Sequence, residues 1–402
     1  MTKDYDELNP SPRLLMGPGP SNVHPRVYRA MATPLVGHLD PEFLVIMDET
    51  MELLREVFGT QNRLTIPVSA TGSAGMEAAL VNILEPGDQA VVCVKGVFGE
   101  RMSDIVQRCG AELFRVEGEW GRIIEPEQVE AVLKRTRKPK VVAIVHAETS
   151  TGVLQPLEEI GRLAREYEAL YLVDTVTSIA GAPINVDAVG IDVCYAGTQK
   201  CLSCPPGLAP ITFSDRAVQV IQNRKTKVQS WYLDMTMISR YWGSERVYHH
   251  TAPVSMIYGL REALRIVHEE GLEARFRRHR YHAAALAAGL EALGVSLAAQ
   301  EGYRAPMLTL ARIPEGVEDR AIRSRLLNEF QLEIGSGLGV FAGKMWRIGL
   351  MGESCRRSSV LICLDALEAC LRDAGHAVAP GAGVAAAEAF YAKTRPEEMP
   401  IA

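Results

Sequence analysis

The sequence predicts an α/β fold in which a large domain, built on a mainly parallel sheet with helices on its faces, is followed by a smaller domain. Short apolar runs rich in β-branched residues alternate with amphipathic segments, which is the pattern of strands and helices in such a fold. Turns rich in glycine and proline separate several of these segments. The 402 residues, 47% of them hydrophobic, suffice for a large domain and a smaller one.

The predicted elements follow one another along the chain. Residues 1–20 are rich in proline and glycine, which predicts an extended arm. Residues 64–68 predict a short strand, and a glycine-rich turn and a helix over residues 76–84 come next. Amphipathic segments such as residues 157–168 predict helices between the later strands. Further apolar runs predict strands at residues 90–94, 141–145, 170–173 and 193–196.

A second, smaller domain is predicted from the part of the chain beyond about residue 255. A helical pattern extends to Leu293, and short strand and helix patterns continue to near Cys370. Alanine, glycine and valine dominate residues 377–387 and charged residues follow, which is typical of weak order. We therefore expect an N-terminal arm at residues 1–20, a large domain at 21–270, a small domain at 271–375 and a weakly ordered tail at 376–402.

Composition excludes several function classes. A net charge of -6 argues against a protein that coats nucleic acid, and no apolar run reaches the roughly 18 residues that span a bilayer. Residues 1–7 are polar and acidic, unlike a secretory signal, and residues 399–402 lack a peroxisomal address. Eight cysteines fit reduced thiols better than a disulfide framework. We expect a cytoplasmic protein that binds small molecules, with no nucleic acid or membrane partner.

Two residues near the middle of the chain indicate a chemistry. Asp174 ends one apolar run, and Lys200 ends the loop that follows the next one, so both could reach the carboxyl edge of the sheet, where ligands gather. A lysine amine can hold the aldehyde of pyridoxal 5′-phosphate (PLP) as a Schiff base, and a buried carboxylate can keep the ring nitrogen protonated. The alternatives are a helix cap for Asp174 and a solvated side chain for Lys200.

A phosphate site is predicted at Thr71-Gly72-Ser73-Ala74-Gly75, between a strand and a helix. Backbone N–H groups at a helix start, together with hydroxyls, bind a phosphate without a strong positive charge. The segment lacks the Gly-x-Gly-x-x-Gly spacing of dinucleotide folds and the Gly-Lys-Ser/Thr of a P-loop, which counts against a dehydrogenase and an NTPase. No metal is expected, since neither the Cys201 and Cys204 pair nor the adjacent His249 and His250 has zinc spacing.

Segments spread in order along almost the whole chain match one enzyme family. They lie at residues 15–22, 71–78, 148–152, 173–178, 197–201, 248–253 and 347–352. With them the chain resembles the class V PLP-dependent aminotransferases, especially the alanine–glyoxylate and serine–pyruvate (serine–glyoxylate) group. The resemblance implies the PLP-dependent transferase fold type I.

The resemblance also implies roles in binding the cofactor. Lys200 would form the Schiff base with PLP and move a proton between substrate and cofactor, while Asp174 would pair with the ring nitrogen. A second subunit would complete the phosphate site, so a homodimer would be part of the mechanism. In this chain the phosphate contacts would be Thr71, Gly72, Ser73 and Gln199, and the second subunit would supply Tyr248 and Thr251.

Further residues would contact the ring and the substrate. Thr149 would lie near the phenolic oxygen of PLP, and Phe98 would stack on the ring. Arg347 would bind the substrate carboxylate bidentately, and Gly19 would lie against the substrate, where a missing side chain leaves room. Simpler alternatives are an interdomain salt bridge for Arg347 and a flexible arm at Gly19. Phe98 replaces a frequent tryptophan of this group, and Ser73 replaces a histidine of some members.

The function implied is an aminotransferase with a ping-pong mechanism that alternates between PLP and its amine form. An amino acid, alanine or serine, would give its amino group to the cofactor, and glyoxylate or pyruvate would then accept it. The donor stays open and includes ureidoglycine or an aminophosphonate.

Two rival hypotheses are a related enzyme, a cysteine desulfurase, and a protein that binds PLP without catalysis. A cysteine desulfurase would need a mobile nucleophilic cysteine before Arg347, whereas Cys355 follows it, and Gln199 stands where a histidine usually precedes the lysine. A non-catalytic domain that binds PLP for regulation lacks support, because the sequence shows no DNA-binding helix-turn-helix or basic arm.

Overall fold

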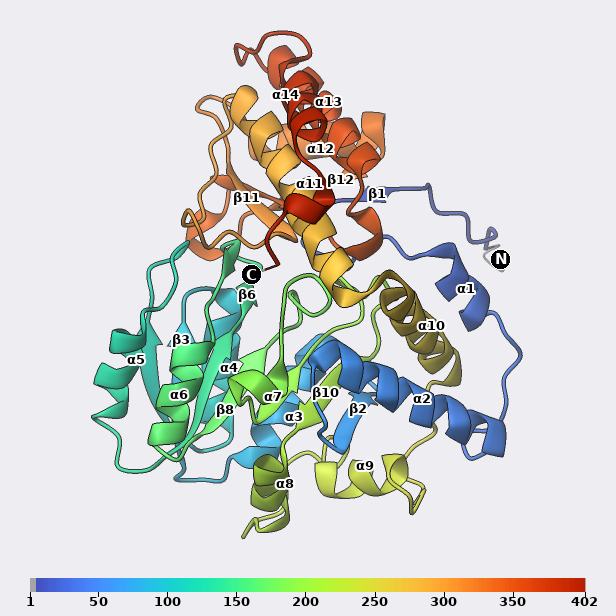
Figure 1. The fold of residues 1–402 in the computed structure, drawn as a ribbon, viewed down its shortest axis with the longest axis vertical. Helices are drawn as coiled ribbons and strands as arrows, with labels where there is room; N and C mark the ends of the chain where they lie inside the picture. Colours follow the sequence, from blue (N-terminus) through green and yellow to red (C-terminus); the bar gives the residue numbers. More distant parts are fainter. Residues whose placement is uncertain (1–4, 402) are drawn as a thin grey trace, which may run out of the picture.

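The computed structural model of the protein describes residues 5–401. Residues 1–4 of the expected arm and residue 402 of the expected tail lie outside the described residues. Figure 1 shows a broad lower body that contains the large sheet and a narrower upper body made mostly of helices. Strand β1 (Leu14–Leu15) lies beside the helices of the upper body, and the last described residues lie near the junction of the two bodies.

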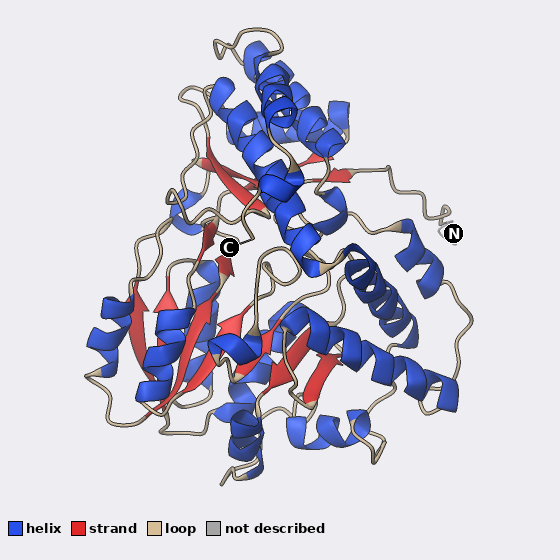
Figure 2. Cartoon of the chain, in the orientation of Figure 1, coloured by secondary structure: helices blue, strands red, loops and turns tan. Residues whose placement is uncertain are grey.

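A seven-stranded sheet forms the centre of the lower body (Figure 2). The strand order is β2-β10-β9-β8-β5-β3-β4, and β10 is antiparallel to both of its neighbours while all other pairs are parallel. This confirms the predicted α/β fold with a mainly parallel sheet. The strands are β2 (Leu64–Val68), β3 (Gln89–Val94), β4 (Glu112–Glu117), β5 (Pro139–Val145), β8 (Leu170–Asp174), β9 (Val193–Tyr195) and β10 (Ala209–Phe213).

All five strands that the sequence predicted belong to this sheet, and β4 and β10 are additional. Strand β4 lies at an edge and is half exposed, so its sequence Glu-Leu-Phe-Arg-Val-Glu lacks a continuous apolar run. Strand β10 contains Pro210 just after a Pro-Pro-Gly turn, and this composition is typical of a loop. Both strands are formed because neighbouring strands pair with them.

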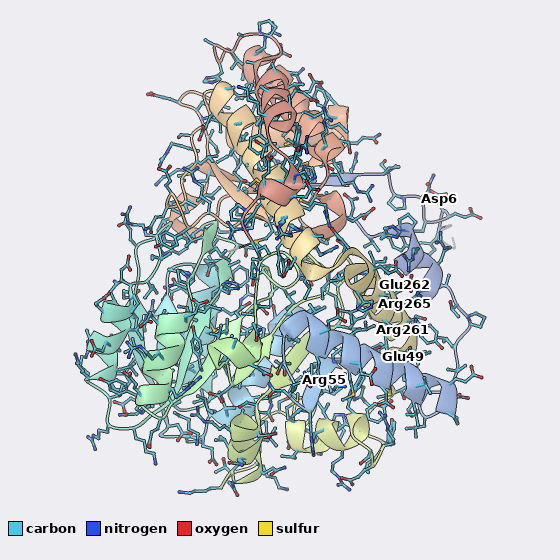
Figure 3. The ribbon with its side chains drawn as sticks, viewed as in Figure 1. Asp6, Glu49, Arg55, Arg261, Glu262 and Arg265 are labelled. Carbon is cyan, nitrogen blue, oxygen red and sulfur yellow. The ribbon has the colours of Figure 1, made fainter. Side chains whose placement is uncertain are left out.

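Helices surround the sheet and share one large core drawn from residues 27–267. Ion pairs join α10 to its neighbours. Arg261 Nε lies 2.5 Å from Glu49 Oε2 in α2 (Figure 3). Glu262 accepts from Arg26 at 2.6 Å. The helices are α1 (Pro25–Met31), α2 (Pro41–Phe58), α3 (Gly72–Ile83), α4 (Val97–Arg108), α5 (Pro126–Leu133), α6 (Glu158–Glu166), α7 (Val186–Val189), α8 (Asp215–Gln222), α9 (Met235–Trp242) and α10 (Val254–Glu270). The hairpin strands β6 (Ala147–Glu148) and β7 (Val153–Leu154) lie beyond the end of β5.

The upper body has its own core, drawn from Met16 and residues 285–387. Gly271, with φ of +80°, separates α10 from α11, the first helix of this body. An antiparallel sheet of order β11-β14-β13 packs with the helices, and β1 of the arm pairs with β12. The elements are β1 (Leu14–Leu15), α11 (Leu272–Ala292), β11 (Leu308–Arg312), α12 (Asp319–Phe330), β12 (Leu332–Glu333), β13 (Gly335–Ser336), η1 (Gly339–Phe341), β14 (Met345–Gly349), η2 (Gly352–Ser354) and α13 (Arg357–Asp373).

The end of the chain contains a packed helix where the sequence predicted a weakly ordered tail. Helix α14 (Ala382–Lys393) lies against α11, and Ala387 is fully buried between them. The small residues that suggested weak order allow this close packing, because a Cβ on Gly289 would come within 3.0 Å of the Gly383 carbonyl oxygen. The short helix η3 (Pro396–Glu398) follows α14. Among the described residues, no helix is both long and apolar enough to cross a bilayer.

Candidate active site

A cavity of about 220 Å³ lies at the carboxyl ends of the central strands. It brings together seven of the residues that the sequence predicted for the site: Gly72, Ser73, Phe98, Thr149, Asp174, Gln199 and Lys200. The remaining lining residues are Met76, Arg101, Val145, Ala147, Val176 and Thr177. Strand ends and helix starts therefore meet here, as expected for the ligand site of a parallel sheet.

Asp174 is the last residue of β8 and is almost fully buried. The Val176 N–H donates to Oδ1 and the Tyr195 hydroxyl donates to Oδ2, both at 2.8 Å. Burial raises the pKa of Asp174 to about 6, although these hydrogen bonds favour the charged form. The helix-cap alternative is wrong, because the chain after Asp174 forms turns and the next helix begins at Val186. No lysine or arginine nitrogen of residues 5–401 lies within 4 Å of this carboxylate.

Lys200 reaches the same cavity from the loop after β9. Its Nζ donates to the Pro18 carbonyl oxygen of the arm. Burial, assisted by the positive charge of Arg347, lowers the pKa of Lys200 to about 8. A solvated lysine is therefore the wrong alternative, and a substantial fraction of the amine is neutral at slightly alkaline pH, as a nucleophile requires.

Gly19 explains how the arm can lie so close to this lysine. A Cβ on Gly19 would come within 2.6 Å of Lys200 Nζ, and the φ of +109° is one that other residues rarely adopt. The arm is thus held against the lysine at a position where only glycine fits without rearrangement.

The predicted phosphate site lies at the start of α3. Thr71 precedes the helix with extended backbone and makes no side-chain cap, and the first N–H groups of a helix have no partner within it. Gly72 sits close to the strand ends, since a Cβ there would lie 3.3 Å from Val176 Cγ2. The buried amide oxygen Oε1 of Gln199 has no hydrogen-bond partner among the described residues. An amide oxygen only accepts hydrogen bonds, so this atom suits a ligand group that donates one.

Helix α4 brings Phe98 to the cavity, and the loop after β6 holds the start of this helix. The Val97 N–H donates to Ser150 Oγ at 3.0 Å, and Ser150 Oγ donates to Glu148 Oε1 at 2.5 Å. Thr149 lies between these two residues, so the loop that carries Thr149 and the helix that carries Phe98 are fixed to each other.

Arg347 lies in β14 of the upper body and points toward the junction with the lower body. Its Nε donates to the Ser336 carbonyl oxygen at 2.7 Å, and Nη1 donates to the Thr149 carbonyl oxygen at 3.4 Å. Burial lowers the pKa of Arg347 to about 10, so it stays charged at neutral pH. No carboxylate of the described chain lies within 4 Å of it, which excludes the alternative of an interdomain salt bridge. Its charge is available to a ligand carboxylate.

Tyr248 and Thr251 lie away from the cavity of this chain. Both side chains are exposed, and the Tyr248 ring packs 5.4 Å from the His38 ring. Their predicted role depends on a second subunit and stays a prediction.

Sequence reasoning missed three residues of the site. Tyr195 is paired in register with Asp174, so a tyrosine opposite the predicted acid on the next strand was a usable signal. Arg101 follows Phe98 by three residues in α4, a spacing that places both on one helix face. Glu148 lies in the family-matching segment at residues 148–152, but the sequence reasoning gave it no role.

The residues present fit PLP. A buried carboxylate without a cationic partner suits a protonated ring nitrogen, and a lysine of lowered pKa suits an aldehyde. A helix start with free N–H groups, next to the Thr71 and Ser73 hydroxyls, suits a phosphate. These features come from different elements and point to a single ligand.

Comparisons with known proteins agree with this geometry. The chain matches the family Aminotransferase class-V over residues 23–368. It is 44% identical over 397 residues to an (S)-ureidoglycine–glyoxylate transaminase of Bacillus subtilis, covering 94% of this chain and 95% of that protein. It is 43% identical over 364 residues to an alanine–glyoxylate aminotransferase of Callithrix jacchus, covering 90% of this chain and 88% of that protein. The crystal structure of an alanine–glyoxylate aminotransferase from Nostoc sp. superposes with a TM-score of 0.91 at 50% sequence identity. The superposition covers 92% of this chain and 98% of that one.

Proposed function

This chain belongs to the class V aminotransferase family, and we propose that it transfers the amino group of a small amino acid, alanine or serine, to glyoxylate or pyruvate. As a member of this family it is a PLP-dependent transaminase of fold type I. The observation that most supports the substrate class is Arg347, a buried guanidinium without an acidic partner that lies close enough to Lys200 to lower its pKa. Amino acids and 2-oxo acids both carry the carboxylate that such a group binds.

Each residue of the site has a chemical task in this proposal. When bound, PLP supplies an electron sink for the α-carbon of the substrate. Asp174 holds the proton on the ring nitrogen, and Tyr195 keeps that carboxylate oriented. Lys200 takes a proton from the amino acid and returns it to the product, a task that suits a pKa of about 8. Arg347 orients the carboxylate of donor and acceptor in turn.

A small substrate is supported by the crowding around Lys200. The Pro18 carbonyl oxygen accepts a hydrogen bond from Nζ, and Gly19 lies against the side chain of the lysine. The arm thereby narrows the space beside the reacting amine, which favours short side chains such as those of alanine and serine.

The acceptor and the donor differ in how strongly relatives support them. Both a ureidoglycine transaminase and alanine aminotransferases among the relatives are named for glyoxylate, which supports glyoxylate as the acceptor. The high identity and coverage of the ureidoglycine–glyoxylate transaminase make ureidoglycine the second candidate donor.

The deciding experiment is a matrix of donors and acceptors. Alanine, serine, cysteine, ureidoglycine and an aminophosphonate are each assayed with glyoxylate and with pyruvate, and kcat/KM is measured for every pair. We expect the highest value for alanine or serine with one of the two acceptors. A value at least tenfold higher for ureidoglycine would replace the proposed donor, and absence of turnover with every pair would contradict the proposal.

A cysteine desulfurase activity has little structural support. Cys355 is fully buried, and burial raises the pKa of its thiol to about 12, whereas a nucleophilic cysteine must be exposed and readily ionised. Sulfide release from cysteine in the donor matrix would contradict this conclusion.

We also propose a homodimer with shared active sites. Several large apolar side chains are more than half exposed on neighbouring segments: Tyr28, Leu35, Val45, Trp231 and Tyr248. The rings of His38 and Tyr248 connect the first of these segments to the last, and Trp231 stacks on His249. A surface of this kind favours a protein partner, and Tyr248 and Thr251 lie on or beside it.

The proposed compartment is the cytoplasm. The eight cysteines are all buried and none forms a disulfide in the structure, which suits a reducing environment.

A further inference from the structure

Arg101 is the residue of the cavity wall that the proposed mechanism leaves without a task. It lies in the second turn of α4, with an exposed side chain whose guanidinium reaches the start of α3. Its Nη1 donates to Ser73 Oγ at 3.0 Å, and its Cζ lies 5.0 Å from the centre of the Phe98 ring. The guanidinium is therefore held between the predicted phosphate contact and the predicted ring contact.

The charge of Arg101 is not neutralised by the protein. No carboxylate of residues 5–401 lies within 4 Å of its guanidinium. The neighbouring Glu100 is bound through both carboxylate oxygens by Arg115, at 2.6 and 2.8 Å, so its charge is already paired. No acidic residue stands in the first turn of α3. An unpaired cation beside a helix start indicates an anionic ligand.

The phosphate of PLP carries more negative charge than the helix start alone neutralises. A phosphate monoester carries about -1.5 to -2 charges at neutral pH, whereas a helix N-terminus is equivalent to about half a positive charge. The only cations among the lining residues of the cavity, all within the described chain, are Lys200 and Arg101. Lys200 is committed to the aldehyde, which leaves Arg101 for the phosphate.

The hydrogen bond from Arg101 leaves the Ser73 hydroxyl able to donate to a ligand. Because Ser73 Oγ accepts from Arg101, its own O–H is free to donate to an acceptor at the start of α3. Serine and arginine can then bind the same phosphate from two sides.

We propose that Arg101 is a cofactor-binding residue whose guanidinium neutralises the phosphate of PLP at the start of α3. The inference rests on the cofactor of this family and is independent of which amino donor the enzyme uses.

The test compares a ligand with the phosphate and one without it. Apoenzyme of the wild type, Arg101→Gln and Arg101→Lys is titrated with PLP and with pyridoxal, and Kd is obtained from tryptophan fluorescence. Arg108→Gln is the matched control, because Arg108 lies on the same helix and pairs with Asp104, outside the cavity. Thermal unfolding of each apoprotein checks that the variants are folded.

We expect Arg101→Gln to raise the Kd for PLP by about 10- to 100-fold, the range for a lost charged hydrogen bond. The Kd for pyridoxal should change by less than about twofold. Arg101→Lys keeps the charge and should lose less affinity for PLP than Arg101→Gln. Arg108→Gln should bind both ligands with the Kd of the wild type. Unchanged PLP binding in Arg101→Gln would overturn the inference. Equal losses for PLP and pyridoxal would also overturn it, since they would assign Arg101 to the support of Phe98. Transamination by the wild type in the donor matrix is a separate result, so either proposal can fail alone.

Discussion

The hydroxyl group of Tyr195 donates a 2.8 Å hydrogen bond to Asp174 Oδ2 across two adjacent parallel strands, β9 and β8. The two residues are direct partners in the register of the sheet, so the backbone pairing itself aligns the donor with the acid. Both side chains are buried, and the phenol can donate but the carboxylate can only accept. Tyr195 is thus a positioning residue for the acid that would face the ring nitrogen of PLP.

Tyr195→Phe removes this donor and leaves a buried carboxylate oxygen without it. We expect the apoprotein to lose about 1–3 kcal/mol of its free energy of unfolding at pH 7. Urea unfolding measures this, and a double-mutant cycle with Asp174→Asn isolates the interaction. If Tyr195→Phe destabilises the Asp174→Asn background as much as the wild type, the hydrogen bond to the carboxylate is not the cause.

Asp174→Asn should stabilise the apoprotein while it removes activity. Burial raises the pKa of Asp174 to about 6 from an ordinary 3.8, so the folded protein binds this proton more tightly than the unfolded chain. The wild type therefore loses stability as the pH rises from about 4 to about 6, by up to about 3 kcal/mol. Asparagine carries no such penalty. Urea unfolding at pH 7 should show the variant to be more stable, and at pH 4 the difference should vanish. A constant difference at both pH values would contradict this explanation.

Position along the sheet explains why much of the site could be predicted. Asp174 and Lys200 follow apolar runs that are strands, and parallel strands deliver their carboxyl ends to one edge, so the sequence was enough to bring them together. Gly72 and Ser73 follow β2 and begin α3 for the same reason. The roles of these residues toward PLP stay predictions.

The features that were missed depend on tertiary contacts. Arg101 is an exposed helical arginine, and only the approach of Ser73 from another helix distinguishes it from a solvated one. Strand β10 has a loop-like composition and is a strand because β2 and β9 pair with it on both sides. Helix α14 has the small residues of a disordered tail, and it is ordered because those residues fit closely against α11.

Gly19→Ala should disturb Lys200 through steric contact. A Cβ at this position would come within 2.6 Å of Nζ, so the lysine must move away from the Pro18 carbonyl oxygen that accepts its hydrogen bond. We expect kcat to fall by about tenfold or more, because small displacements of a reacting group slow catalysis strongly. Gly316→Ala is the control, since Gly316 has a φ of +80° but a Cβ there would meet no atom within 4 Å. Steady-state kinetics measure both variants, and an equal fall in kcat would point to backbone strain instead.

Arg347→Gln should weaken the binding of substrates, because it removes the group that would bind their carboxylate. The guanidinium has no acidic partner in the described chain. A hydrogen bond from such a charged group contributes about 1.5–3 kcal/mol of binding free energy, which the variant loses. KM for both amino acid and keto acid should therefore rise by about 10- to 100-fold. The control is Arg312→Gln in the adjacent strand β11, because Arg312 is exposed. An unchanged KM for both substrates of Arg347→Gln would contradict the proposed role.

Mixed dimers test whether a second subunit completes the site. Lys200→Ala should be inactive, and Tyr248→Phe/Thr251→Val should be weakly active if these side chains hold the phosphate across the interface. In a hybrid of the two chains, one site combines both defects and the other has every residue intact. Random reassociation of equal amounts should therefore restore about a quarter of wild-type activity. Refolding the two variants together and separately, followed by the transamination assay, measures this. Activity no higher than the average of the separate variants would show that Tyr248 and Thr251 act within their own chain or not at all.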